Sequence, residues 1–241
     1  MRSVGRTAGV ATVVLAAAAG LAGCRDHLAP VALLSSPNGA HTVTAGRGGL
    51  DTADFELASG VTTLVLHSGD LGGALYRVVT PPGSGVLPAA VVSGGHVVVQ
   101  LNSSGTGGPA VVDVTLNSAV SWTVHEDGGA TEATVDMSAG GLAVLDFAAG
   151  VSRIDATLPE PGGTVVVRLG GGASEFTVHA PSGVPTRVAL DGGAGSATID
   201  GTQHTGIAGG TAYTPDGWDN ATNRVDVDNT AGVGTFTLVR Y

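Results

Sequence analysis

The sequence predicts an all-β protein, a single-domain β-solenoid whose coils are about 21 residues long. Two observations carry this prediction. Glycine, which makes up 40 of the 241 residues, recurs at a nearly constant interval, and apolar and polar residues alternate at fixed distances from each repeating glycine. Recurrence at a fixed interval is typical of architectures in which equivalent units stack on one another. We therefore predict that the chain folds into a stack of similar coils.

The repeat is visible from the middle of the chain onward. Five glycines follow one another at intervals of 21, 21, 22 and 21 residues, and the same unit returns after 39 residues. These glycines are Gly108, Gly129, Gly150, Gly172, Gly193 and Gly232. Because glycine adopts positive φ without steric cost, we expect these positions to be the corners between strands.

A strand follows each repeating glycine. The fourth and sixth residues after it are apolar in all six units, whereas the fifth is polar. Alternation of period two predicts a strand with one buried face. The predicted core positions are Val112, Ala133, Ile154, Phe176, Ala197, Phe236, Val114, Val135, Ala156, Val178, Ile199 and Leu238. The residues between and after them, such as Asp113 and Thr115, form an outer face that is either a soluble surface or a flat recognition surface.

A second strand precedes the glycine in each unit. These strands are predicted at His96–Leu101, Ala119–Val124, Ala143–Phe147, Thr164–Leu169, Thr186–Leu190 and Arg224–Asp228. Residues 54–95 read as one or two degenerate coils, with strands near Thr62–His67 and Ala74–Thr80. An antiparallel β-sandwich also gives short alternating strands, but it does not require a register that is kept over several units, so the solenoid is favoured.

The N-terminal segment has the features of a targeting signal. Arg2 and Arg6 precede an apolar run over residues 8–23, which is short for a membrane span. The run ends in Leu-Ala-Gly-Cys at residues 21–24, which resembles the lipobox of bacterial lipoproteins. The resemblance implies cleavage before Cys24, attachment of a diacylglyceryl group to its thiol, and a lipid-anchored protein on the extracytoplasmic face of the cell membrane. An ordinary signal peptide that happens to end at a Cys is the alternative.

The domain organisation follows from these signals. We expect a lipoprotein signal peptide over 1–23, a lipid-anchored tether over 24–53, and the β-solenoid over 54–241, with regular coils from about residue 96. The interval of 39 predicts a loop excursion over 202–222, a segment rich in Gly and Pro. It carries His204, Tyr213 and Trp218, which are candidates for binding a glycan or an envelope protein. Alternatively, Trp218 covers the open end or a side of the solenoid.

Charge, composition and the lack of catalytic motifs argue against several classes of function. The net charge is −10 and no Lys is present, which argues against a nucleic-acid partner. No nucleophile elbow, metal-ligand pair or calcium repeat is found, so we expect no cofactor, no metal and no enzymatic activity. The cluster His125-Glu126-Asp127 is expected to be a solvated turn rather than a metal site. Asp226 and Asp228 alternate with valines, so we expect them on the outer face of the last coil.

Two segments carry a family resemblance. GGAGSATIDG at 192–201 and TAGVGTFTLV at 230–239 are similar to repeats of bacterial β-solenoid domains of the putative-adhesin and LiaF-like "toast-rack" type. The longer stretch from Thr211 to Leu238 resembles the C-terminal pattern of actinobacterial members. This resemblance implies an envelope-facing β-solenoid, in some relatives linked to envelope-stress signalling, and it supplies no catalytic residues.

The function expected from these observations is that of a non-enzymatic cell-envelope lipoprotein, whose solenoid surface serves adhesion, scaffolding or partner binding. A regulatory sensor module of an envelope-stress system is the alternative, and a polysaccharide-active enzyme is a third possibility. The expected partners are the membrane, through the lipid anchor, and an envelope protein or glycan.

Overall fold

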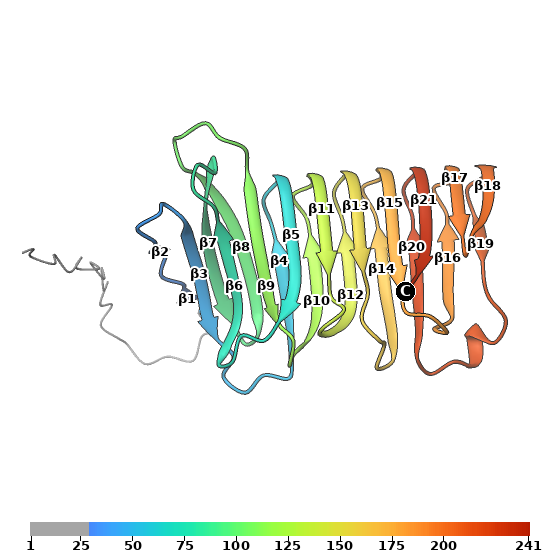
Figure 1. The fold of residues 1–241 in the computed structure, drawn as a ribbon, viewed down its shortest axis with the longest axis horizontal. Helices are drawn as coiled ribbons and strands as arrows, with labels where there is room; N and C mark the ends of the chain where they lie inside the picture. The colour runs from blue at the N-terminus through green and yellow to red at the C-terminus, as the bar shows by residue number, and fades with distance from the viewer. Residues whose placement is uncertain (1–28) are drawn as a thin grey trace, which may run out of the picture.

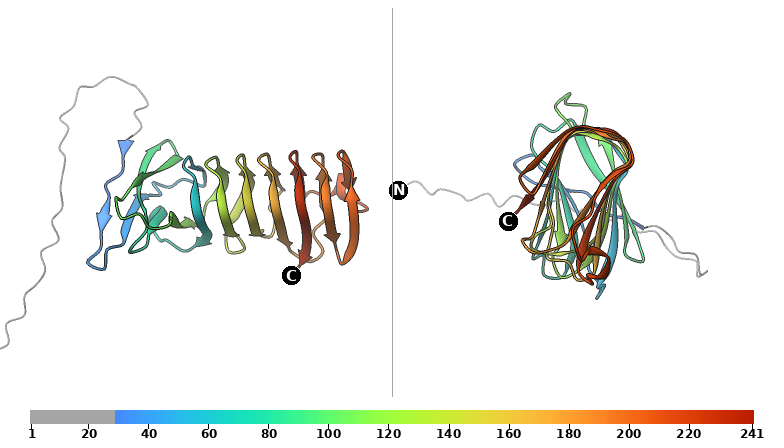
Figure 2. Two further views of the ribbon diagram at one scale, coloured as in Figure 1. Left: turned by 90° about the horizontal axis from the view of Figure 1, so that it is seen from above. Right: turned by 90° about the vertical axis from the view of Figure 1, so that its right-hand side faces the viewer.

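A computed structural model describes residues 29–241. The predicted signal peptide and Cys24 lie outside the described residues. The chain forms two large sheets that face each other and enclose one elongated core (Figure 1). The fold is a β-solenoid, as predicted. Viewed along the long axis, the coils superimpose into one narrow outline (Figure 2).

The ten-stranded sheet consists, in spatial order, of β1 (Ala29–Pro30), β7 (Val86–Ser93), β8 (His96–Ser103), β4 (Thr52–Leu57), β10 (Ser121–Glu126), β12 (Gly141–Phe147), β14 (Thr164–Leu169), β20 (Arg224–Asn229), β16 (Thr186–Leu190) and β19 (Thr211–Tyr213). The eleven-stranded sheet consists of β18 (Thr202–Ile207), β17 (Ala194–Ile199), β21 (Val233–Arg240), β15 (Ala173–Ala180), β13 (Val151–Thr157), β11 (Ala130–Asp136), β5 (Val61–Gly69), β9 (Val111–Asn117), β6 (Ala74–Thr80), β3 (His41–Gly46) and β2 (Leu34–Ser35).

Each regular coil contributes one strand to each sheet, and equivalent strands pair in parallel with matched register. The predicted core columns are confirmed: eleven of the twelve positions are buried, and Ile199, near the end of the stack, is partly buried. Stacking places like residues over one another. Phe236 lies beside Phe176 on the neighbouring strand, and Phe147 faces Phe176 from the other sheet, with ring centroids 5.5 and 6.3 Å from that of Phe176 in edge-to-face geometry. Such pairs add to the stability gained from burial alone.

The spatial order of the coils differs from their order in the sequence at both ends of the stack. The coil β4–β5 lies between β8–β9 and β10–β11, although β6 to β9 follow it in the chain. Likewise, the last coil, β20–β21, lies between β14–β15 and β16–β17. The repeat spacing predicts that the coils are equivalent, but it does not say in which order they stack.

The glycine corners explain why the coils accept this order. In space, corners of the form X-Gly, where X is Ser or Ala, alternate with corners of the form Gly-Gly; the six corners run 59–60, 128–129, 149–150, 171–172, 231–232 and 192–193. The second glycine of each Gly-Gly corner has φ between +73° and +79°. The first lies against the backbone of an X-Gly corner, and a Cβ there would overlap that backbone. Each corner type therefore needs the other type beside it.

Two predicted boundaries are corrected by the structure. Residues 29–53, expected to belong to the tether, are part of the folded domain, because β3 pairs antiparallel with β6 and β1 pairs antiparallel with β7. Residues 202–222, expected to be a loop, contain β18, β19 and the short 3-10 helix η1 (Trp218–Asn220). These strands pair antiparallel with β17 and β16, so they are not a further parallel coil. The Gly-rich sequence suggested an irregular backbone. The free edges of β16 and β17 at the end of the stack instead pair with it as β19 and β18.

Candidate functional site

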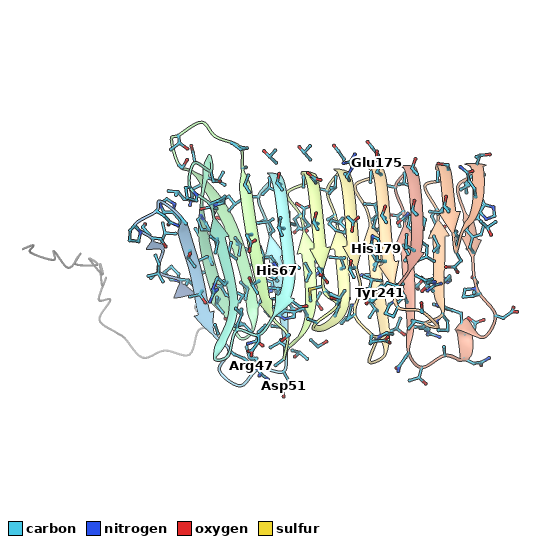
Figure 3. The ribbon with its side chains drawn as sticks, in the orientation of Figure 1. Arg47, Asp51, His67, Glu175, His179 and Tyr241 are labelled. Carbon is cyan, nitrogen blue, oxygen red and sulfur yellow. The ribbon has the colours of Figure 1, made fainter. Side chains whose placement is uncertain are left out.

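The outer face of the eleven-stranded sheet carries rows of polar side chains that run along the stack. One row joins His67, Asp136, Thr157 and His179 through matched register, and His67 and His179 lie at about the same level of the sheet (Figure 3). The imidazole of His179 lies 3.2 Å from the Asp155 carboxylate. Toward one end of the strands, Arg153 Nε donates to Glu175 at 2.9 Å. Neighbouring coils thus place opposite charges beside each other, which avoids repulsion between stacked acids.

A groove of about 540 Å³ lies at one end of this face. It crosses β5, β9 and β6, where parallel pairing changes to antiparallel pairing. Five aliphatic residues contribute to its lining, together with four polar residues. The aliphatic residues are Val65, Val79, Pro81, Val111 and Val112; the polar ones are His67, Arg77, Asp113 and Thr115. An apolar surface with a few convergent polar groups is the usual character of a ligand site.

The polar groups of the groove give it a defined chemistry. His67 Nε2 and Thr115 Oγ1 lie 3.1 Å apart, which fixes the imidazole. Arg77 is exposed, and it has no salt-bridge partner among the side chains of residues 29–241. An unpaired guanidinium is free to bind a carboxylate or another anionic group of a ligand. The aliphatic residues can contact an apolar part of the same ligand.

The outer face of the ten-stranded sheet differs from this surface. One register row alternates acidic and basic residues, in the order Glu56, His125, Asp146, Arg168 and Asp228. His125 Nδ1 lies 3.4 Å from the Asp146 carboxylate. Asp226, on the same face, accepts a hydrogen bond from Arg187 Nε at 2.8 Å. As predicted, Asp226 and Asp228 lie on the outer face, where the neighbouring charges balance one another.

Glu126 was expected in a solvated turn, and this is wrong. It ends β10 with its side chain pointing inward and 1% exposed, and its register neighbours are Leu57 and Phe147. Among the residues that the structure describes, neither carboxylate oxygen has a hydrogen-bond partner. Burial raises the pKa of Glu126 to about 7, with a smaller increase from Asp127, and the peptide N–H groups of Gly129 and Gly128 offset part of the increase. The alternation along β10 continues for two residues beyond Val124, the expected strand end, and this brings Glu126 into the core.

Trp218 packs against the solenoid. Its side chain is 8% exposed, and its indole N–H donates to the Val225 carbonyl at 2.8 Å. The guanidinium groups of Arg224 and Arg187 lie over the ring, with Cζ 4.3 and 4.9 Å from its centroid. Arg224 also donates to the carbonyl oxygens of Trp218 and Asp219. Of the two roles considered for Trp218, covering the solenoid agrees with this geometry, and an exposed contact does not.

His204 and Tyr213 meet at the C-terminal end of the stack. His204 lies on β18 opposite Ala197, and Tyr213 lies on β19 opposite Val188, so both side chains point toward the space between the sheets. Their ring centroids are 4.6 Å apart. Both residues are partly buried. They therefore bridge the two sheets and close the end of the core, while one side of each ring remains at the surface.

Sequence reasoning missed the groove residues His67 and Arg77. They belong to the degenerate part of the repeat, over residues 54–95, where no coil-to-coil comparison picks out an unusual side chain. The available signal is that His67 interrupts a run of Val, Thr and Leu in a predicted strand. Within residues 29–241 no group of three or more His, Cys, Asp or Glu is arranged to hold a metal ion. None of the helices in that range is long and apolar enough to span a membrane.

The fold and this surface define a β-solenoid with an exposed, grooved face. No family model matches the chain, and no curated protein matches it. Among solved structures, a putative cell adhesion protein from Clostridium sporogenes shares the fold, with a TM-score of 0.59 and 16% identity over 84% of this chain and 99% of that chain. A putative adhesin from Bacteroides fragilis aligns with a TM-score of 0.23 and 10% identity over 82% of this chain and 97% of that one. A TM-score of 0.23 is too low for the second alignment to carry an argument. At 16% identity, the first alignment shows a shared fold and nothing more.

Proposed function

We propose that this protein is a non-enzymatic, adhesin-like protein of the cell envelope, which binds a surface partner through the outer face of its eleven-stranded sheet. The observation that carries the proposal is the groove over β5, β9 and β6, where an unpaired Arg77 and the fixed His67 stand beside an aliphatic floor. The shared fold with a protein named for cell adhesion supports the same role.

The proposal includes a lipid anchor at Cys24. Ala29, the first described residue, lies five positions after Cys24, and a fully extended chain of that length spans at most roughly 17 Å. The end of the solenoid formed by β1, β2 and β3 would then lie near the membrane. The opposite end, formed by β18 and β19, would point away from it (Figure 1). The groove over β5, β9 and β6 would face sideways. The lipobox resemblance supports this arrangement.

Binding to isolated cell envelopes of the producing organism tests the proposal. The protein used is the full-length chain with Cys24→Ser, labelled with a fluorophore, so that no acyl chain contributes to the binding. Combining His67→Ala with Arg77→Glu should abolish saturable binding. The control is Arg168→Glu, which makes the same charge change at an exposed arginine of the other sheet. Equal binding by all three proteins would exclude the groove as the binding surface.

A further inference from the structure

The four sheet edges of this solenoid are unequal. Within residues 29–241, the ten-stranded sheet ends in β1, with two residues, and β19, with three. The eleven-stranded sheet ends in β2, with two residues, and β18, with six. Very short edge strands are one of the devices by which proteins prevent edge-to-edge association. Three of the edges have this protection, and β18 lacks it.

The composition of β18 does not protect it either. Its sequence, Thr-Gln-His-Thr-Gly-Ile, contains no proline and no Asp, Glu, Lys or Arg. Four of its six residues are exposed. Charged side chains and prolines are the other common protection of an edge strand. In a chain with a net charge of −10, an edge strand without formal charge is a surface on which two copies do not repel each other.

The two edges at this end form one unit. β18 and β19 end the two sheets at the same end of the stack (Figure 1), and the contact between His204 and Tyr213 joins them across the core. The edges are therefore held at the fixed spacing of two packed sheets, about 10 Å. A partner that pairs with both must present two strands at that same spacing. A second copy of this chain does so.

We propose that two copies of this protein associate end to end through β18 and β19. A twofold axis that lies in the end face and crosses both strands at a right angle places each strand antiparallel to its own counterpart. One symmetry operation thereby extends both sheets across the interface, as an isologous contact requires. The backbone N–H and C=O groups of the two β18 strands pair, the short β19 strands meet beside them, and the partly buried rings of His204 and Tyr213 become enclosed between the two cores.

The register of β18 identifies the side chains that test this pairing. Gln203 and Thr205 lie opposite Thr198 and Ser196, on the outer face of the sheet. Both are exposed, so charged replacements are accommodated in the monomer. In the antiparallel pair, each lies near its counterparts on the other copy. Two glutamates at these positions therefore bring four like charges together in the dimer.

Sedimentation velocity over a range of protein concentrations measures the association, using the full-length chain with Cys24→Ser. The parent protein should show a monomer–dimer equilibrium. Gln203→Glu with Thr205→Glu should weaken it by roughly a hundredfold, and Gln203→Arg with Thr205→Arg should do the same, because like charges across an interface are strongly unfavourable. An equimolar mixture of the acidic and basic variants should restore the dimer. Circular dichroism melts establish that each variant is folded.

The matched control adds two charges at the opposite end, with Ser35→Glu and Ser36→Glu at the exposed β2 edge, and should leave the dimer intact. A parent protein that stays monomeric at all concentrations overturns the proposal. So does a dimer that survives in the acidic and the basic variants alike. A mixture that fails to restore association when both folded variants are monomeric also overturns it. None of these readings depends on envelope binding or on acylation.

Discussion

The guanidinium of Arg224 lies over the indole of Trp218, with its Cζ 4.3 Å from the ring centroid. The two residues stand at the start of the final coil, and Arg224 also donates to the Trp218 carbonyl at 3.1 Å. The contact therefore fixes the point at which the chain leaves the end of the stack and turns back into it.

Trp218→Ala should lower the free energy of unfolding by about 3–5 kcal/mol, because it leaves a cavity and removes the partner of the Val225 carbonyl. Trp218→Phe keeps most of the contact area and should cost less. Denaturant unfolding measures both. If Trp218→Ala unfolds like the parent, the side chain does not hold the last coil in place.

Phe176→Asp should prevent stable folding, because it buries an unpaired carboxylate between Phe147 and Phe236. Thr177→Asp, one residue later and on the outer face beside Asp155, should cost at most about 1 kcal/mol, the scale of a like-charge pair on neighbouring strands. Thermal melts of the two variants compare them directly. Equal midpoints would mean that the two faces of β15 are assigned incorrectly.

Gly171→Ala should be strongly destabilising, since its methyl group would overlap the backbone of Ala149 in the adjacent corner. Gly162→Ala serves as the control, because there a methyl group meets nothing within 4 Å and φ is not positive. A difference in chemical denaturation midpoint between the two variants is expected. If Gly171→Ala is as stable as Gly162→Ala, the corners have more room than the alternating arrangement implies.

Glu126 should make stability depend on pH. Its pKa is raised from 4.5 to about 7 in the folded state, so the unfolded chain loses its proton first as pH rises. Stability should therefore fall between about pH 4.5 and 7, by about 3 kcal/mol for this group, and level off above that range. Glu126→Gln should remove this component, which urea unfolding across the pH range measures.

The control for Glu126 is Glu132→Gln, at an exposed position on β11. This variant should retain the pH dependence of the parent. The interpretation fails if Glu126→Gln and the parent lose stability in parallel between pH 4.5 and 7.

Cys24→Ser should abolish the incorporation of a labelled fatty acid into the protein, because Cys24 is the only Cys in the chain. The cell fraction should change as well, from membrane to soluble. Labelling in growing cells followed by electrophoresis measures the first effect. Label retained on the variant, or a parent protein free of lipid, would contradict the predicted anchor.

The fold could be predicted from the sequence to the extent that it repeats. The alternation of apolar and polar residues after Gly172 predicts that Phe176 and Val178 are buried, and both are. In a strand whose side chains alternate between two faces, the apolar set can face the core in only one way. The sequence could not give the order of the coils. Parallel strands of similar composition pair equally well in several orders, and what selects among them is steric contact between corners, such as that of Gly171 with Ala149.

The candidate site was predictable only in part. His204 and Tyr213 were identified because aromatic residues are rare in this chain, and the structure brings them together. The groove depends on the change from parallel to antiparallel pairing between β9 and β6, which leaves no periodic trace in the sequence. Whether Glu126 is buried depends on where β10 ends, and strand ends are set by tertiary packing more than by local sequence.

The insertion of β20–β21 into the stack also concerns biosynthesis. β16 pairs with β20 and β19, and β17 pairs with β21 and β18. A nascent chain that has reached residue 213 therefore holds a four-stranded unit with no partner in the coils made before it. Residues 224–240 follow that unit in the chain and join it to the rest. The unit should thus dock onto the earlier coils only after residue 240 has left the ribosome. A premature stop shortly before Arg224 should leave the facing ends of the two parts exposed to proteases.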